Sequence, residues 1–237
     1  MSQLCYHINM PNNKGKIIVF EGADASGKGT QSKLLYEYLI NNHIKSFFLD
    51  FPQYNSFYGR LISKYLKGEL GKLNEVSPYF VSLAFALDRL AFKEEIVKRL
   101  NDGNIIVANR YVTSNLAHQV VKFDNEKEQN ELKNWIEELE YSVNCLPREN
   151  IVIYLDMPEE FSSSLLKKKG EREYIGKGHD IQEKDKDYQR KTISLYRHLS
   201  LSNPHWIKIS CVEHGVIKPI TEIHKEVLKV LKDKEII

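Results

Sequence analysis

The chain has 237 residues, enough for one large domain or two small ones. Its 34 Lys and Arg residues nearly balance its 32 Asp and Glu residues, so the formal net charge is only +2. This balance argues against the basic excess of nucleic-acid-binding and membrane-surface proteins, and we expect neither nucleic acid nor membrane as a partner.

Residues 1–14 are polar and contain no apolar core of a signal peptide. No apolar run of the sequence approaches the ~18 residues that a membrane-spanning helix needs. We therefore expect a cytoplasmic protein. Pro11-Asn12-Asn13 breaks regular structure, which predicts a flexible N-terminal extension over residues 1–15 in front of a single domain over residues 16–237.

From residue 16 onward, short apolar runs alternate with stretches of helical periodicity. The apolar runs predict strands at 16–21, 46–50, 104–108, 151–155 and 206–210. The periodic stretches predict helices at about 28–42, 56–67, 77–102, 114–122, 126–144, 159–168, 184–199 and 220–232. This alternation predicts an α/β fold with a doubly wound, parallel, five-stranded sheet flanked by helices.

The first strand runs into a glycine-bounded loop, and a helical pattern follows at once. Gly22 and Gly27 stand five apart and Lys28 comes next, which is the spacing of a phosphate-binding P-loop. The N–H groups of such a loop and the positive end of the following helix hold an anion. The expected donor-phosphate site consists of Gly22, Ala23, Asp24, Ala25, Ser26, Gly27, Lys28, Gly29 and Thr30. The alternative is a chance glycine-rich turn, which the strand before and the helix after it disfavour.

Ligands of doubly wound sheets bind beyond the carboxyl ends of the strands, where Asp24, Arg110 and Asp156 are expected. Phe85 and Arg89 stand four apart in the helix predicted over 77–102, so they project from one face of it. The ring could lie against a base, and the guanidinium could donate two hydrogen bonds to a phosphate. The alternative is that Phe85 belongs to the core and Arg89 is solvated or ion-paired. From the pair alone this alternative is favoured.

These segments together resemble the thymidylate kinases of the P-loop nucleoside-monophosphate kinase group. The resemblance rests on the strand and P-loop, Phe51-Pro52-Gln53-Tyr54, Phe85-Ala86-Leu87-Asp88-Arg89, Asn109-Arg110-Tyr111 with Ser114-Asn115, and Asp180-Ile181-Gln182-Glu183-Lys184-Asp185. It covers nearly everything from Lys16 to the C-terminus. Apart from the P-loop, each motif is weak by itself, but their order and spacing are specific.

The resemblance implies a role for each matching residue. Phe85 stacks on thymine, Arg89 contacts the base, and Arg110 grips the dTMP phosphate. The acceptor pocket is expected to comprise Phe51, Pro52, Tyr54, Phe85, Arg89, Arg110, Ser114, Asn115, His118 and Gln182. The expected magnesium ligands are Asp24, Thr30 and Glu183, and Asp24 also lies near the sugar 3′-hydroxyl. Residues of about 167–184 resemble a mobile lid that closes over ATP.

Gly29 departs from the usual P-loop, where Ser or Thr ligates magnesium; the hydroxyl follows one residue later at Thr30, an ending that some nucleoside-monophosphate kinases share. Four other positions depart from the thymidylate kinase pattern. Gln182 stands where some relatives carry an aromatic residue. Asn109 replaces the usual Asp before Arg-Tyr and brings no negative charge. Gln53 stands where many relatives have a basic residue. His118 occupies a place often filled by Tyr or Phe that screens against ribose, although a lone His is more often structural.

The expected reaction is in-line phosphoryl transfer from ATP to dTMP with magnesium and without a covalent intermediate. The expected catalytic residues are Lys28, Arg110, Asp24 and Arg172. Arg172 is chosen because no variable P-loop position is basic, and because only a guanidinium among the lid cations offers forked donor geometry. Relatives are commonly dimers, so we expect a homodimer.

Two alternatives stay open. The first is another monophosphate kinase that acts on dUMP, UMP or AMP. The second is a P-loop regulatory switch, against which the sequence has no Asn-Lys-x-Asp motif and has two candidate acceptor-phosphate arginines.

Overall fold

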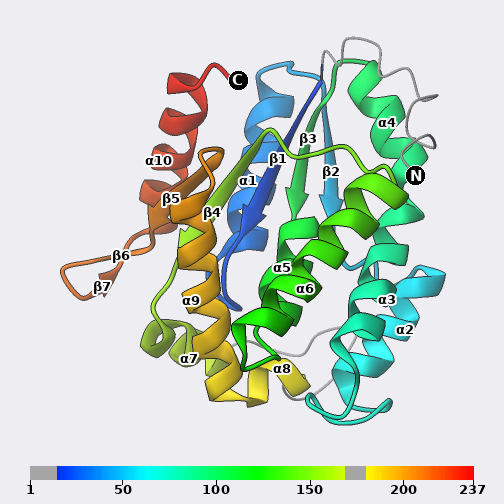
Figure 1. Ribbon diagram of the computed structural model, residues 1–237. Helices are drawn as coiled ribbons and strands as arrows, with labels where there is room; N and C mark the ends of the chain where they lie inside the picture. The colour runs from blue at the N-terminus through cyan, green and yellow to red at the C-terminus, as the bar shows by residue number, and fades with distance from the viewer. Residues whose placement is uncertain (1–14, 169–179) are drawn as a thin grey trace.

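A computed structural model describes residues 15–168 and 180–237, and its centre is one parallel sheet. The five strands are β1 (Lys16–Glu21), β2 (Ser46–Asp50), β3 (Ile105–Asn109), β4 (Ile151–Asp156) and β5 (Trp206–Ser210). Their order is β2-β3-β1-β4-β5, and every neighbouring pair is parallel. The prediction of a doubly wound parallel sheet is therefore confirmed (Figure 1).

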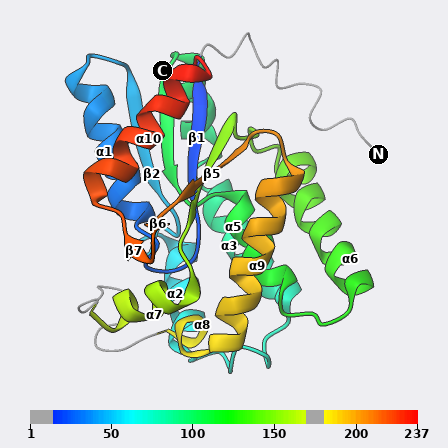
Figure 2. The same ribbon diagram turned by 90° about the vertical axis from the view of Figure 1, so that its left-hand side faces the viewer.

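Helices cover both faces of the sheet because the strands are apolar on both sides. On β1, Ile17 and Val19 pack into one layer of the core, and Ile18 and Phe20 pack into the other. The first layer contains α4 (Lys93–Asn101), α5 (Val112–Val120), α6 (Glu126–Glu137) and α9 (Lys186–Ser202). The second contains α1 (Lys28–Asn41) and α10 (Ile220–Asp233). Figure 2 shows α1 and α10 on one side of the sheet and α6 and α9 on the other.

The remaining helices gather near the carboxyl ends of the strands. They are α2 (Phe57–Lys67), α3 (Pro78–Leu90), α7 (Glu159–Lys168) and the short α8 (Ile181–Lys184). Ile62, Leu66 and Val81 form a separate small core between α2 and α3, with Ile181 of α8 against it. Within the described ranges, no helix has both the length and the apolar character that a membrane span requires.

The single helix predicted over 77–102 is wrong, because the chain forms two helices with a break at Ala91 and Phe92. The Phe92 N–H bonds to the Arg89 carbonyl at 3.0 Å, which tightens the last turn of α3. The Phe92 ring packs edge-on against Phe51, with 5.8 Å between ring centroids. Anchoring this ring in the core favours the break over continued helical periodicity.

The helix predicted over 126–144 changes its winding part-way. It is α-helical to Glu137 and then continues as a π-helix over Glu138–Val143. The wider turn places Glu140 in the interior, where it is fully buried. A π-helical segment is rare and often occurs at a functional site.

A two-stranded hairpin that the sequence did not predict follows β5. Its strands are β6 (Val212–Glu213) and β7 (Val216–Ile217), paired antiparallel. His214 and Gly215 make the two-residue turn with φ values of 49° and 75°. Gly at the second position is the usual signal for such a turn, but two-residue strands are too short to show a periodicity.

The described chain starts at Gly15, which was assigned to the flexible extension. Gly15 is buried, and its N–H donates to the Leu100 carbonyl at 3.1 Å. A Cβ here would lie 2.4 Å from the Asn104 carbonyl oxygen, so only glycine fits this approach. Residues 1–14 lie outside the described residues.

Candidate active site

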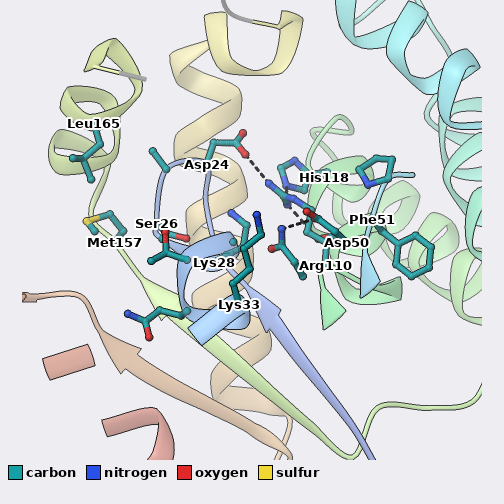
Figure 3. Close-up of a pocket in the computed structure, with 18 of the residues that line it drawn as sticks. Asp24, Ser26, Lys28, Lys33, Asp50, Phe51, Arg110, His118, Met157 and Leu165 are labelled. Atoms are coloured by element: carbon teal, nitrogen blue, oxygen red, sulfur yellow. Dashed lines mark hydrogen bonds and ion pairs between the residues drawn. The ribbon is translucent and has the colours of Figure 1, made fainter. Parts of the chain in front are cut away.

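A cavity of about 1080 Å³ opens beyond the carboxyl ends of the strands. It is lined by the P-loop, the ends of β2 and β3, α3, α5, and the start of α10. Figure 3 shows several of these side chains around the pocket. The predicted site residues that line it are Asp24, Ala25, Ser26, Gly27, Lys28, Gly29, Thr30, Phe51, Pro52, Tyr54, Phe85, Arg89, Arg110, Ser114, Asn115, His118 and Gln182. Gly22, Ala23 and Glu183 are absent from this lining, and Arg172 lies outside the described residues.

The P-loop turns sharply between β1 and α1. Gly22 has a φ of 145°, and a Cβ there would lie 2.7 Å from the Leu155 carbonyl oxygen. Gly27 has a φ of 91° and directly precedes α1. Lys28 is buried and donates to the Ala23 carbonyl at 2.6 Å, so its ammonium group lies against the loop itself.

Arg110, directly after β3, presents its guanidinium to the cavity with three partners. Nη2 donates to Asp24 Oδ1 at 2.6 Å, and Nη1 donates to Ser114 Oγ at 3.2 Å and to His118 Nε2 at 2.9 Å. Burial alone would lower the pKa of Arg110, but attraction to Asp24 outweighs it and raises the pKa. The group is a fixed cation, held on the side of the cavity away from β4.

Neutral His118 is fixed between Arg110 and Tyr188. Tyr188 donates its hydroxyl hydrogen to the His118 carbonyl at 2.9 Å, so its oxygen must accept from His118 Nδ1–H at 2.8 Å. The lone pair of Nε2 is then left to accept from Arg110. Burial, followed by the repulsion of Arg110, lowers the pKa of His118 to about 3.

A buried carboxylate beneath Arg110 organises the end of β3. Glu21 is fully buried at the end of β1 and accepts four hydrogen bonds. The donors are Tyr111 N–H at 3.2 Å, Thr113 Oγ1 at 2.7 Å, Ser114 Oγ at 2.6 Å and Tyr196 O–H at 2.8 Å. Glu21 was not predicted as a site residue, although an acidic residue at the end of an apolar strand was a visible signal.

Arg89 lines the cavity and is ion-paired in the interior, which is the alternative that the Phe85–Arg89 pair alone favoured. Its contact with a ligand stays a prediction. Arg89 is 2% exposed, and its Nε donates to Glu140 Oε2 at 3.0 Å while Nη2 contacts Oε1. Burial would lower the pKa of Arg89, but the Glu140 carboxylate outweighs it and the pKa is raised. Asn115 Nδ2 donates to the same Oε1 at 3.0 Å and to the Ser82 carbonyl at 3.0 Å. No sequence signal identified Glu140, because α-helical periodicity does not describe a π-helix.

The loop after β2 is held by a second carboxylate that the sequence analysis left without a role. Asp88 is 1% exposed and accepts from Gln53 N–H at 2.8 Å and from Ser56 Oγ at 2.8 Å. Gly59 lets this loop lie on α2, because a Cβ there would be 1.8 Å from the Gln53 carbonyl oxygen. Phe51 packs into the core and also lines the cavity.

Phe85 on α3 and Gln182 on α8 both line the cavity. Phe85 is half-buried and packs against the small core between α2 and α3. Gln182 is buried in α8, whose first turn is capped by the carboxylate of Asp180. Glu183 completes that capping box by accepting from Asp180 N–H at 3.4 Å. Among the described residues no group of three or more His, Cys, Asp and Glu side chains could hold a metal ion.

Comparison with known proteins identifies the family. The family model described as thymidylate kinase matches residues 20–227. The chain is 33% identical to the thymidylate kinase of Plasmodium falciparum over 219 residues, which span 90% of this chain and 93% of that protein.

The chain belongs to the thymidylate kinase family.

Other relatives agree with this assignment. The thymidylate kinase of Schizosaccharomyces pombe is 32% identical over 153 residues, which span 64% of this chain and 66% of that protein. A solved structure of the Candida albicans thymidylate kinase superimposes with a TM-score of 0.72 at 22% identity, covering 93% of this chain and 92% of that one. The resemblance inferred from the motifs is confirmed, and the thymidylate kinase fold accounts for the sheet and P-loop described above.

Proposed function

We propose that this chain transfers the terminal phosphoryl group of ATP to dTMP, giving dTDP and ADP. The observation that carries the proposal is that one cavity joins the P-loop to Arg110, a fixed cation beyond the end of the neighbouring strand. A P-loop by itself only binds phosphates. A second phosphate-binding group facing it in the same space makes transfer between two phosphates possible.

The donor end of the cavity is the P-loop with Lys28 and Thr30. The first turn of α1 adds the positive end of the helix dipole, which stabilises the phosphates of ATP. Lys28 would exchange its contact with the Ala23 carbonyl for a phosphate oxygen. We assign the whole run from Gly22 to Thr30 to ATP binding, as its spacing predicts.

The acceptor end is the Arg110 side of the cavity. Arg110 would bind the dTMP phosphate, and Asp24 would hold the guanidinium in place and lie near the sugar. Phe85 offers a half-buried ring on which thymine can stack. Arg89, Asn115 and Gln182 line the same cavity and would contact the thymine base. Asn115 Oδ1 is buried and has no partner among the described residues, so it is suited to accept a hydrogen bond from the base.

Magnesium, when bound, would neutralise charge that develops on the transferred phosphoryl group. Of the ligands expected from the sequence, Thr30 and Asp24 line the cavity, whereas Glu183 caps α8. Asn109, in the place of the usual Asp, also lines the cavity but brings no negative charge to a metal. Magnesium keeps several waters in such sites, so few protein ligands are needed.

The chain's own contribution to the chemistry is positioning and positive charge. Lys28 and Arg110 fix the two phosphates in line, and no covalent intermediate is required. The proposal also includes a lid over residues of about 167–184 and Arg172 as a catalytic cation. Both parts rest on the sequence alone. Arg172 lies outside the described residues.

A homodimer is part of the proposal as well. Phe57 on α2 and Phe80 on α3 are 75% and 73% exposed, and α2 and α3 pack against each other. Exposed aromatic rings are enriched in subunit interfaces, so these two side chains are where we expect contact with a second copy. Light scattering on the protein as it elutes from a size-exclusion column gives its molar mass, which for a homodimer is twice that of one chain.

The decisive experiment supplies ATP and Mg²⁺ to the purified full chain with dTMP, dUMP, UMP, AMP or no acceptor. We expect ADP and dTDP in equal amounts with dTMP, and little ADP without an acceptor. Preference for another monophosphate would identify a different kinase, and acceptor-independent binding without turnover would indicate a regulatory switch. Lys28→Ala, which should abolish turnover, controls for contaminating kinases.

A further inference from the structure

Two polar side chains meet where β2 and β3 end. Asp50 and Asn109 are register partners in the parallel pair, and Asn109 Nδ2 donates to Asp50 Oδ1 at 2.7 Å. Both residues line the cavity together with Lys28, Gly29 and Thr30. Figure 3 shows Asp50 and Lys28 among the side chains around it. From the sequence, Asn109 was expected to bring no negative charge to the site, and no role was assigned to Asp50.

The Asp50 carboxylate carries a negative charge toward the cavity. Asp50 is exposed, and the Asn109 amide is the one group among the described residues that hydrogen-bonds its carboxylate. No ion pair within the described part of the chain includes Asp50. By contrast, Asp24 already binds Arg110 at 2.6 Å. Asp50 is therefore a carboxylate of this cavity that no described cation neutralises.

The Asp50–Asn109 pair lies directly against the P-loop helix. A Cβ on Gly29, in the first turn of α1, would be 3.6 Å from Asn109 Nδ2. Gly29 leaves this space open and also brings no hydroxyl to it. The pair thus faces the turn beside which the bound phosphates of ATP would lie.

We propose that Asp50 is the carboxylate that holds the magnesium of Mg·ATP in this chain, through metal-bound water and in place of the charge that Asn109 lacks. Magnesium retains several waters, and a carboxylate accepts hydrogen bonds from them without direct ligation. Asn109 has a positioning part in this arrangement. Its Nδ2 donates to Asp50 Oδ1 and so orients the carboxylate, and its size lets it fill the end of β3 without adding a charge. The inference rests on the proposed function only in requiring that the P-loop binds ATP.

The test measures nucleotide binding rather than turnover. A non-hydrolysable ATP analogue, AMP-PNP, is titrated into the full chain by calorimetry, once with Mg²⁺ and once with EDTA, and dTMP is absent throughout. For Asp50→Asn we expect the Mg²⁺-bound analogue to bind at least ~10-fold more weakly, the loss of about one charge-assisted contact. The metal-free analogue should bind equally well or more tightly, because a negative charge near its phosphates is gone.

Two further variants sharpen the result. Glu37→Gln removes another exposed carboxylate that lines the same cavity from α1, and it should change neither titration. The double variant Asp50→Asn with Asn109→Asp swaps the amide and the carboxylate across one hydrogen bond. It should restore most of the increase in AMP-PNP affinity that Mg²⁺ gives the wild-type chain. Mn²⁺ can replace Mg²⁺, and its electron paramagnetic resonance signal then reports the bound metal directly.

An unchanged Mg²⁺-dependent gain in Asp50→Asn would overturn the inference. Equal weakening of both titrations would do so too, because it would mean that Asp50 only supports the fold. A wild-type chain that binds Mg·AMP-PNP but fails to phosphorylate dTMP would refute the proposed function and leave this inference standing.

Discussion

His118 Nε2 accepts a hydrogen bond from Arg110 Nη1 at 2.9 Å, so a neutral ring helps to aim the cation of the acceptor site. Replacing His118 with Phe keeps a planar ring and removes the acceptor, while Asp24 and Ser114 still bind Arg110. We expect kcat/KM for dTMP to fall about 3- to 10-fold, the equivalent of roughly 1 kcal/mol, with little change in KM for ATP. Steady-state kinetics with each substrate varied in turn measures both. His118→Gln retains an acceptor oxygen, so its kcat/KM for dTMP should fall less. Equal kcat/KM values for the Phe variant and the wild type would contradict a role for His118 in aiming Arg110.

The same histidine makes stability depend on pH in a defined window. Its pKa is about 3 in the folded chain, against 6.5 for an ordinary histidine side chain, so between these limits the unfolded chain binds more protons. Stability from this group therefore rises as pH increases from about 3 to 6.5 and is constant above. We expect the free energy of unfolding of His118→Phe to fall less steeply than that of wild type on acidification through this window. Urea unfolding at a series of pH values tests the difference in slope, and parallel curves would count against a buried neutral His118.

The Arg89–Glu140 pair should dominate the stability of the helices around the acceptor site. Glu140→Gln leaves the fully buried guanidinium of Arg89 without its counter-charge, and we expect a loss of about 3–5 kcal/mol in the free energy of unfolding. The double change Arg89→Met with Glu140→Leu removes both charges. It should lower the free energy of unfolding by less than Arg89→Met alone and Glu140→Leu alone do in sum. Urea denaturation of the wild type, both single variants and the double variant measures the four free energies of unfolding that this comparison needs.

An exposed pair supplies the matched control for that comparison. Arg99 and Glu95 lie 2.6 Å apart and are 37% and 36% exposed, so breaking this pair should cost less than about 1 kcal/mol. Additive effects at Arg89 and Glu140 would show that the buried pair is not coupled. Because Arg89 variants lose stability, their dTMP affinity must be measured where circular dichroism shows them folded.

Arg172 carries the prediction about catalysis that comes from the sequence. A well-placed arginine in a phosphoryl transfer is worth roughly 10³–10⁵ in rate, and no variable P-loop position is basic. We expect Arg172→Ala to lower kcat at least ~100-fold with little change in dTMP affinity, because the contact forms mainly in the transition state. Single-turnover rates and equilibrium binding separate the two quantities. Near wild-type turnover would exclude Arg172 and direct attention to Lys168 and Lys169.

Much of the fold could be predicted because its signals are local. The strand Ile105-Ile106-Val107-Ala108 is apolar throughout, as a strand buried on both faces must be. The P-loop is visible because glycine spacing is a property of neighbouring residues. The break at Phe92 was not visible, because it depends on a contact with Phe51, which lies 41 positions earlier.

The site was predicted unevenly for the same reason. Residues that face the cavity from strand ends, such as Arg110, could be located from topology. Residues that hold them, such as Glu21, Asp88 and Glu140, are buried acids whose partners come from distant segments. A sequence shows that such an acid is present but not which donors surround it. Only the folded arrangement distinguishes it from a solvated charge.

Position 110 also bears on how this enzyme can be engineered. Arg110 adopts a φ of 66°, a left-handed conformation that costs a residue with a side chain roughly 1–2 kcal/mol and costs glycine almost nothing. Its ion pair with Asp24 offsets part of that cost and is also what aims the guanidinium. A screen for heat resistance and a screen for turnover would therefore select in opposite directions at this residue. Thermostable variants of the chain are best sought elsewhere, with position 110 held constant.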